Sequence, residues 1–118
     1  MRLRHTVAAS LGALALVVTL PTSASAATGD FSYKYVGLDG LPRSVTLHDP
    51  HSPACITLPE VADPYVSPPA FAPHNNTDVW ATVFTEPGCT GDSWKLKPHG
   101  NPATDRLKLR SVYLSESR

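Results

Sequence analysis

Few groups of side chains in this sequence could form a metal-binding or catalytic site. His48 and His51 stand three residues apart with Asp49 between them, an arrangement that could supply two metal ligands. Pro50 places the group in a turn, and no third or fourth ligand is obvious, so we predict no metal site here. The other interpretation is a solvated turn whose start is stabilised by Asp49.

A pair of carboxylates, Glu86 and Asp92, flanks Cys89 in a turn, and such a pair can perform acid–base catalysis. On an exposed turn of a small domain, we expect them to be solvated charges instead. The sequence contains no nucleophile-elbow, His-Glu-x-x-His or glycine-rich phosphate-binding pattern. A domain of this size also has little room for a deep pocket. We therefore predict that the protein is not an enzyme, has no catalytic residues and uses no cofactor.

Residues 1–26 have the pattern of a secretory signal peptide. A basic start precedes a short apolar run over 7–20, Pro21 ends that run, and the small residues 24–26 fit a signal-peptidase site. A membrane anchor is the alternative, but a span needs about 20 apolar residues. We expect cleavage after Ala26, a secreted protein and no membrane association of the mature chain.

The predicted mature chain, residues 27–118, has 118 − 26 = 92 residues and forms a single domain. Removal of Arg2 and Arg4 leaves 8 basic and 10 acidic side chains, a net charge of 8 − 10 = −2. This charge gives no electrostatic attraction to nucleic acid or to anionic membranes. We expect a monomer.

Both cysteines, Cys55 and Cys89, lie in the predicted mature chain. An even number of cysteines in an exported protein indicates a disulfide, which here would close a loop of about 35 residues. The chain-entropy relation values such a loop at roughly 3–4 kcal/mol. That amount matters to a small domain with a marginal core. The alternative, a redox or nucleophilic thiol, lacks any visible setting that would lower a thiol pKa.

Alternating apolar residues predict an all-β protein of about six to eight short strands. The pattern favours strands over 30–37, 43–49, 54–60, 79–86, 93–98 and 106–115. No amphipathic helix is evident, and turn signals recur along the chain, which is typical of a sandwich or barrel. In the fifth of these strands, Trp94 and Leu96 should face one way while Lys95 and Lys97 face the other.

Residues 61–78 interrupt this rhythm with four prolines, which predicts a surface connection outside the β-ladders. The segment also carries a glycosylation sequon, Asn75-Asn76-Thr77, in what we expect to be a polar turn. Its aromatic residues, Tyr65 and Phe71, suit a rigid partner-binding loop, because little entropy is lost when such a loop docks. The alternative is a flap that covers the edge of a sheet.

Residues 82–112 resemble a βγ-crystallin Greek-key motif. Phe84 is followed by six residues and then by Gly91, with Ser111 downstream. In that family the glycine permits a folded corner, the aromatic ring packs over it, and the serine hydroxyl bonds back to it. The pattern is degenerate in the first half, although both halves run strand, proline turn, cysteine, strand. The resemblance implies a small Greek-key β-sandwich.

Calcium-binding members of that family carry two Asn or Asp residues, two variable residues and then Ser/Thr-Ser. The matching segment is 106–111, which reads Arg-Leu-Lys-Leu-Arg-Ser. Both oxygen-ligand positions are missing, and the cationic side chains would repel Ca²⁺. We predict no strong calcium site in this half.

The sequence therefore predicts a secreted, non-enzymatic binding or structural protein whose partner is an extracellular protein or a cell-surface ligand. The candidate contact residues are Tyr65, Phe71, Glu86 and Asp92. Secreted bacterial proteins of the resembled fold include a metalloproteinase inhibitor and killer-toxin-like proteins, so a protease inhibitor and an antimicrobial toxin are the alternatives. None of these activities follows from a fold.

Overall fold

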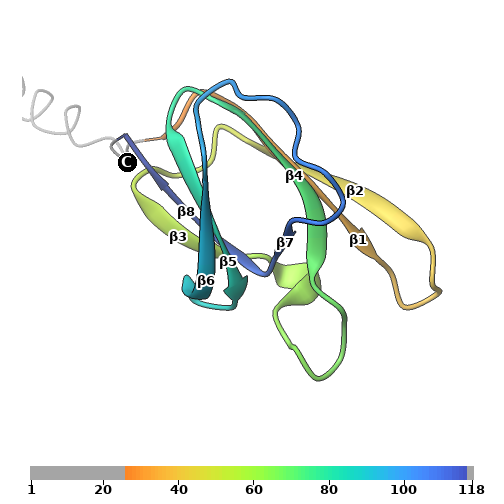
Figure 1. Cartoon of the computed structure of the whole chain (residues 1–118). Coiled ribbons are helices and arrows are strands. Elements are labelled where there is room, and N and C mark those ends of the chain that lie inside the picture. Colours follow the sequence, from red (N-terminus) through yellow and green to blue (C-terminus); the bar gives the residue numbers. More distant parts are fainter. Residues whose placement is uncertain (1–25, 117–118) are drawn as a thin grey trace, which may run out of the picture.

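The computed structural model describes residues 26–116, and the predicted signal peptide lies outside this range apart from Ala26. The described part contains eight strands and one short 3-10 helix: β1 (Gly29–Val36), β2 (Pro42–His48), β3 (Ala54–Thr57), η3 (Pro59–Val61), β4 (Ala70–Thr77), β5 (Trp80–Glu86), β6 (Thr90–Leu96), β7 (Lys108–Leu109) and β8 (Ser111–Ser115). The strands form two antiparallel four-stranded sheets (Figure 1). The predicted small all-β sandwich is confirmed. Within residues 26–116 no helix has the length and apolar character needed to cross a membrane.

The two sheets repeat one strand order with the halves of the chain exchanged. One sheet has the order β2-β1-β4-β7 and the other the order β3-β8-β5-β6. Strands β2, β1 and β4 of the first sheet correspond in order to β6, β5 and β8 of the second sheet, when the second sheet is read from its other end. The third strand of each half, β3 or β7, pairs in the opposite sheet. Each half is thus a Greek key that gives one strand to its counterpart.

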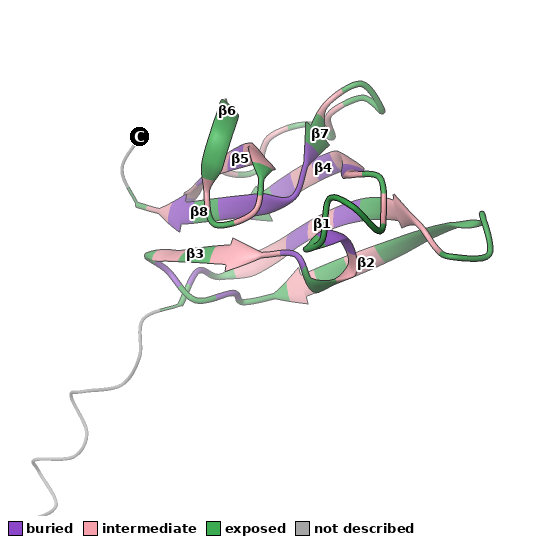
Figure 2. Cartoon of the chain, turned by 90° about the horizontal axis from the view of Figure 1, so that it is seen from below, coloured by how far each residue is buried: buried purple, intermediate pink, exposed green. Residues whose placement is uncertain are grey.

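The core lies between the sheets, where the buried faces of the strands meet (Figure 2). In β1, Phe31 and Tyr33 point inward, and the other fully buried large apolar residues are Leu58, Val61, Val83, Leu109, Val112 and Leu114. The half-buried residues Val45, Leu47 and Ile56 pack against this cluster. In β1, β2 and β3 the more buried side chains thus follow the two-residue period of a strand.

The segment from Ala70 to Thr77 is strand β4, at the centre of its sheet, so the prediction of a surface connection over 61–78 was wrong for its second part. Pro73 is tolerated there because β4 bulges: Ala72 has φ +52°, and the register with β1 shifts between Ser32 and Lys34. Proline has no backbone N–H to donate, and a bulged residue does not take part in the hydrogen-bond ladder, so the bulge can hold Pro73. Only residues 62–69 remain a loop.

The predicted strand over 106–115 is two strands in different sheets. β7 ends at Leu109 and pairs with β4, whereas β8 begins at Ser111 and pairs with β3 and β5. Between them, Arg110 is buried. Four consecutive buried residues, 109–112, break the two-residue period, and this break is where the chain crosses between the sheets.

Candidate functional site

The turn between β5 and β6 folds over the outer face of its sheet and covers Ser111. The Ser111 Oγ donates a hydrogen bond to the Glu86 carbonyl at 2.6 Å and accepts one from the Cys89 N–H at 2.8 Å. Phe84 pairs with Ser111 in the register of β5 and β8. Gly91 has φ +89°, in the left-handed region that favours glycine. The structure therefore brings Phe84, Gly91 and Ser111 together in one folded corner.

The disulfide fastens this corner to β3. Cys55 and Cys89 are bonded with their Cα atoms 6.1 Å apart, as predicted. A second link joins the same elements, because the Gly88 N–H donates to Thr57 Oγ1 at 2.9 Å. No free thiol remains among the described residues. The turn that carries Glu86 and Asp92 is thus an architectural element.

We expect Gly91→Ala to destabilise the protein by about 2–3 kcal/mol, because both backbone strain and a steric clash oppose the new methyl group. A Cβ at this position would lie 2.5 Å from Thr85 Oγ1 and 2.8 Å from Glu86 Cγ. The measurement is the free energy of unfolding from urea titration.

Gly88→Ala is the matched control for that variant. Gly88 has φ +71° in the same turn, but a Cβ there would meet no atom within 4 Å. Its cost should be limited to the backbone term of about 1–2 kcal/mol. Equal losses for the two glycines would show that the close approach at Gly91 contributes nothing.

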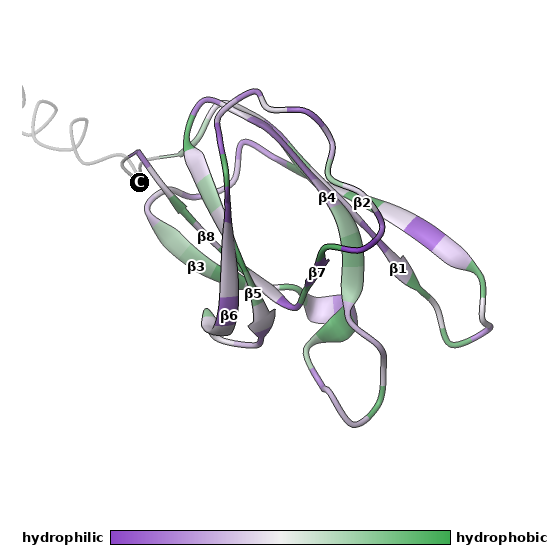
Figure 3. Cartoon of the chain, viewed as in Figure 1, coloured by the Kyte–Doolittle hydropathy of each residue, from purple (hydrophilic) through white to green (hydrophobic). Residues whose placement is uncertain are grey.

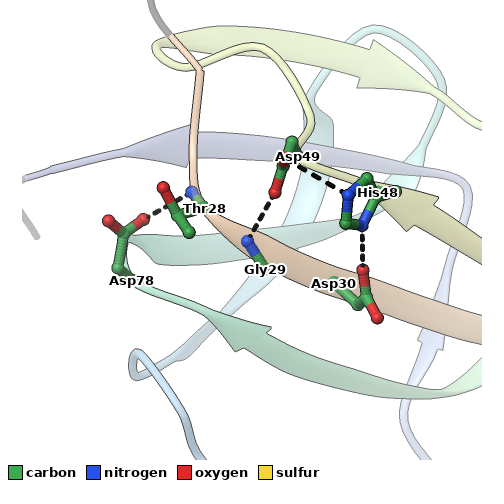
Figure 4. Close-up of polar contacts among 6 residues, drawn as sticks. All are labelled: Thr28, Gly29, Asp30, His48, Asp49 and Asp78. Atoms are coloured by element: carbon green, nitrogen blue, oxygen red, sulfur yellow. Dashed lines mark hydrogen bonds and ion pairs between the residues drawn. The ribbon is translucent and has the colours of Figure 1, made fainter.

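His48 lies between two carboxylates at the start of β1, as Figure 4 shows. Its Nδ1 is 2.8 Å from Asp30 Oδ1, and its Nε2 is 3.3 Å from Asp49 Oδ2. The hydrogen bond to Asp30 and the negative charges of Asp49 and Asp30 raise the pKa of His48. Nδ1 is thus hydrogen-bonded to Asp30, and Nε2 forms an ion pair with Asp49 when the ring is protonated.

The neighbouring carboxylates hold the chain where β1 begins (Figure 4). Asp49 Oδ1 accepts the Gly29 N–H at 2.7 Å, and Asp78 Oδ1 accepts the Thr28 N–H at 2.8 Å. His51, the other histidine considered as a ligand, forms a backbone bridge with Ala26. In the part of the chain that the structure describes, no three His, Cys, Asp or Glu residues are grouped to hold a metal. This cluster stabilises a strand end.

The four candidate contact residues lie on different elements. Tyr65 is in the loop 62–69 and is 97% exposed, whereas Phe71 is half-buried in β4 with the Lys108 ammonium 5.1 Å from its ring centroid. Glu86 ends β5 and Asp92 lies in β6; both are exposed. Phe71 is therefore part of a sheet and does not belong to a partner-binding loop.

Four exposed apolar side chains lie on two segments that border one hollow, and we call this set the apolar rim. Leu38 (92% exposed) and Leu41 (59%) lie in the β1–β2 hairpin, and Tyr65 (97%) and Val66 (63%) lie in the loop 62–69. Both segments project from the sandwich and carry apolar colour in Figure 3. An open hollow of about 480 Å³ lies between them and is lined by Leu38 and Val66 among others.

Buried hydrogen bonds fix the loop that carries Tyr65. The Arg110 guanidinium donates to the Val61 carbonyl and to the Ser67 carbonyl, both at 2.9 Å, and so ties the two ends of the loop together. Within the loop, Asp63 accepts the N–H groups of Tyr65 and Val66. The tip is thus a hydrogen-bonded turn.

The facing hairpin is fixed by its own turn. Asp39 accepts the N–H of Leu41 at 3.1 Å and pairs with the Arg43 guanidinium. The backbone N–H of Leu41, and then the charge of Arg43, lower the pKa of Asp39. Gly40 supplies the positive φ of +81° that the turn requires. The apolar rim is therefore held by short-range polar contacts on both sides.

Of the four residues in the apolar rim, the sequence identified Tyr65 as a candidate contact residue but did not identify Leu38, Leu41 or Val66. The available signal was the position of Leu38 and Leu41 on either side of Asp39-Gly40, a dipeptide typical of a turn. A large apolar residue in a tight turn cannot reach the core, so it must be exposed.

No family model, curated protein or solved structure matches this chain.

Proposed function

We propose that this chain is a non-enzymatic, exported binding protein that engages a protein partner through the apolar rim. The observation that carries the proposal is the exposure of four apolar side chains on two segments that border one hollow, which Leu38 and Val66 line. Apolar residues exposed singly need no explanation, but a contiguous exposed patch with a polar surround is typical of an interaction site. Tyrosine is also enriched among the residues that contribute most to protein interfaces.

Preorganisation of the rim supports the same proposal. The guanidinium of Arg110 ties both ends of one loop, and Asp39 holds the turn of the hairpin. A partner that docks on preformed loops does not have to order them, so less conformational entropy is lost on binding. The disulfide supports export, since disulfides persist in oxidising compartments.

The resemblance to βγ-crystallin Greek keys remains part of the proposal. The exchange of β3 and β7 between the sheets and the bonding of Ser111 beneath the corner support it. The alternative of a protease inhibitor is less well supported. Protease clefts bind extended segments, whereas the tip at Tyr65 is a hydrogen-bonded turn.

Photo-crosslinking followed by titration tests the proposed surface. A photoreactive benzoylphenylalanine replaces Tyr65, or Lys95 as the control on the exposed strand β6, and each protein is mixed with medium and cell-surface proteins of the producing culture. We expect a single adduct that forms from position 65 and not from position 95. The adduct partner is then purified and titrated with Leu38→Ser/Tyr65→Ser, which should bind at least about 30-fold more weakly than the wild type.

Tyr113→Ser, an exposed aromatic on the outer face of a sheet, should bind that partner as the wild type does. Equal binding by Leu38→Ser/Tyr65→Ser and the wild type would exclude the rim as the contact surface. Stoichiometric inhibition of a metalloprotease, a subtilisin-like protease or a trypsin-like protease by the wild type would instead favour the inhibitor.

A further inference from the structure

Trp94 faces the inside of the sandwich and is nevertheless exposed. It pairs across β6 and β5 with Val83, which is buried, so both side chains lie on the inner face of their sheet. Trp94 is 62% exposed because the opposite sheet ends there in β7, a strand of only two residues (Figure 1). One of the two tryptophans thus lies on a flank of the sandwich that no strand of residues 26–116 covers.

Two adjoining hollows meet at this tryptophan, and we call them together the Trp94 flank. One, of about 340 Å³, is lined by Trp94, Leu107, Thr104 and Arg106 among others. The second, of about 150 Å³, shares Trp94 and Leu107 and adds the polar residues Asp92 and Ser93. Half-buried Leu107 packs against the core and lines both hollows together with Trp94.

Polar groups without partners border the indole. Within residues 26–116, the Arg106 guanidinium, the Asp92 carboxylate and the Trp94 indole N–H form no hydrogen bond or ion pair with another described residue. The Lys108 ammonium is engaged, since it donates to the Asp105 carbonyl at 2.8 Å. Beside the flat indole ring there are thus a negatively charged hydrogen-bond acceptor, Asp92, and a positively charged hydrogen-bond donor, Arg106.

This combination fits a ring-shaped ligand that has an apolar face and a hydroxylated edge. An aromatic ring stacks on the C–H face of a sugar ring, while carboxylate, guanidinium and hydroxyl groups bond the sugar hydroxyls. The opposed charges of Asp92 and Arg106 favour a neutral ligand over a strongly anionic one. Addition of a partner strand is disfavoured, because the exposed residues Lys95 and Lys97 lie on and just after the edge strand β6.

We propose that the Trp94 flank binds a neutral polysaccharide of β-1,4-linked pyranose rings, whose equatorial substituents leave flat C–H faces to stack on the indole. Glucose and N-acetylglucosamine polymers share this chemistry. The site is separate from the apolar rim and does not depend on the function proposed for it.

Nuclear magnetic resonance titration of the full mature chain tests this site, with cellohexaose and chitohexaose as probes. Either sugar should shift the indole N–H signal of Trp94 and leave that of Trp80 in place, with a dissociation constant of about 0.1–1 mM. Tighter binding of cellohexaose would identify a glucose polymer as the ligand, and tighter binding of chitohexaose an N-acetylglucosamine polymer. Maltohexaose, an α-linked and curved chain, is the control ligand and should bind at least about tenfold more weakly.

Substitutions then assign the contacts. Trp94→Ala should weaken binding at least about tenfold, Trp94→Tyr should retain part of the affinity, and Arg106→Gln should weaken it about threefold or more. Thermal unfolding of each variant establishes that it is folded, and Tyr65→Ala, on the apolar rim, should bind sugar as the wild type does. The proposal is overturned if neither probe shifts the Trp94 signal at about ten times the upper dissociation constant, or if folded Trp94→Ala binds as tightly as the wild type.

Discussion

Asn75→Asp is expected to reduce the free energy of unfolding by about 3–5 kcal/mol, close to the limit of what a small domain can lose. Asn75 is 1% exposed in β4, and its amide nitrogen lies 2.8 Å from the Val79 carbonyl, 3.1 Å from that of Leu96 and 3.0 Å from that of Lys97. Its amide oxygen accepts the N–H and the hydroxyl of Thr77. A carboxylate of the same shape would place negative charge against three carbonyl oxygens in a buried site. Urea titration followed by circular dichroism measures the loss.

Lowering the pH separates the destabilisation caused by the negative charge of Asn75→Asp from that caused by the lost amide contacts. Burial would raise the pKa of the new carboxyl above its unfolded value, so its penalty is present at neutral pH and is relieved as the pH falls through the folded-state pKa. Asn75→Ala should lose about 2–4 kcal/mol with no such relief. The adjacent exposed residue provides the control, Asn76→Asp, with a change within about 0.5 kcal/mol. If Asn75→Ala also stays within that range, the amide network is not stabilising.

Removal of the disulfide should cost about 3–4 kcal/mol and lower the melting temperature by roughly 15–25 °C. Cys55 and Cys89 are 34 residues apart, and the bond restricts the unfolded chain over that whole loop. In the folded state it also pins the corner above Ser111 to β3. Differential scanning calorimetry of Cys55→Ala/Cys89→Ala against the wild type measures the effect.

A reductant provides the internal control for the disulfide variant. Reduced wild type should melt near the temperature of Cys55→Ala/Cys89→Ala, and the variant itself should not respond to the reductant. A wild-type melting temperature that moves by less than about 3 °C on full reduction would contradict the loop-entropy argument.

The sequence predicted the parts of the fold that depend on local periodicity. The ranges 30–37 and 54–60 were predicted as strands from alternation, and in β1 Phe31 and Tyr33 share the inner face because neighbouring side chains in a strand point to opposite sides. The spacing from Phe84 to Gly91 marked the corner, since a tight backbone turn needs a positive φ that glycine adopts freely.

The parts that depend on distant contacts could not be predicted in this way. Pro73 argued against a central strand, and only the bulge at Ala72 makes one possible. Asn75 looked like a glycosylation site in a polar turn, yet two of the three carbonyls that its amide nitrogen contacts come from the end of β6 and beyond. Trp94 shares a face with Leu96, as alternation predicted, but its exposure follows from the shortness of β7, which strand propensity does not encode.

The exchange of strands between the sheets also determines when this protein can finish folding. The first half cannot complete its Greek key by itself, because Ala54 of β3 pairs with Leu114 of β8, 114 − 54 = 60 residues later. Contacts this distant in sequence slow folding, since a long loop must close before any contact stabilises it. The first sheet lacks an edge strand until β7 emerges from the ribosome or from an export channel, and the second lacks an inner strand until β8 emerges. Until then the chain stays open to proteases, and Cys55 and Cys89 have no folded structure to bring them together.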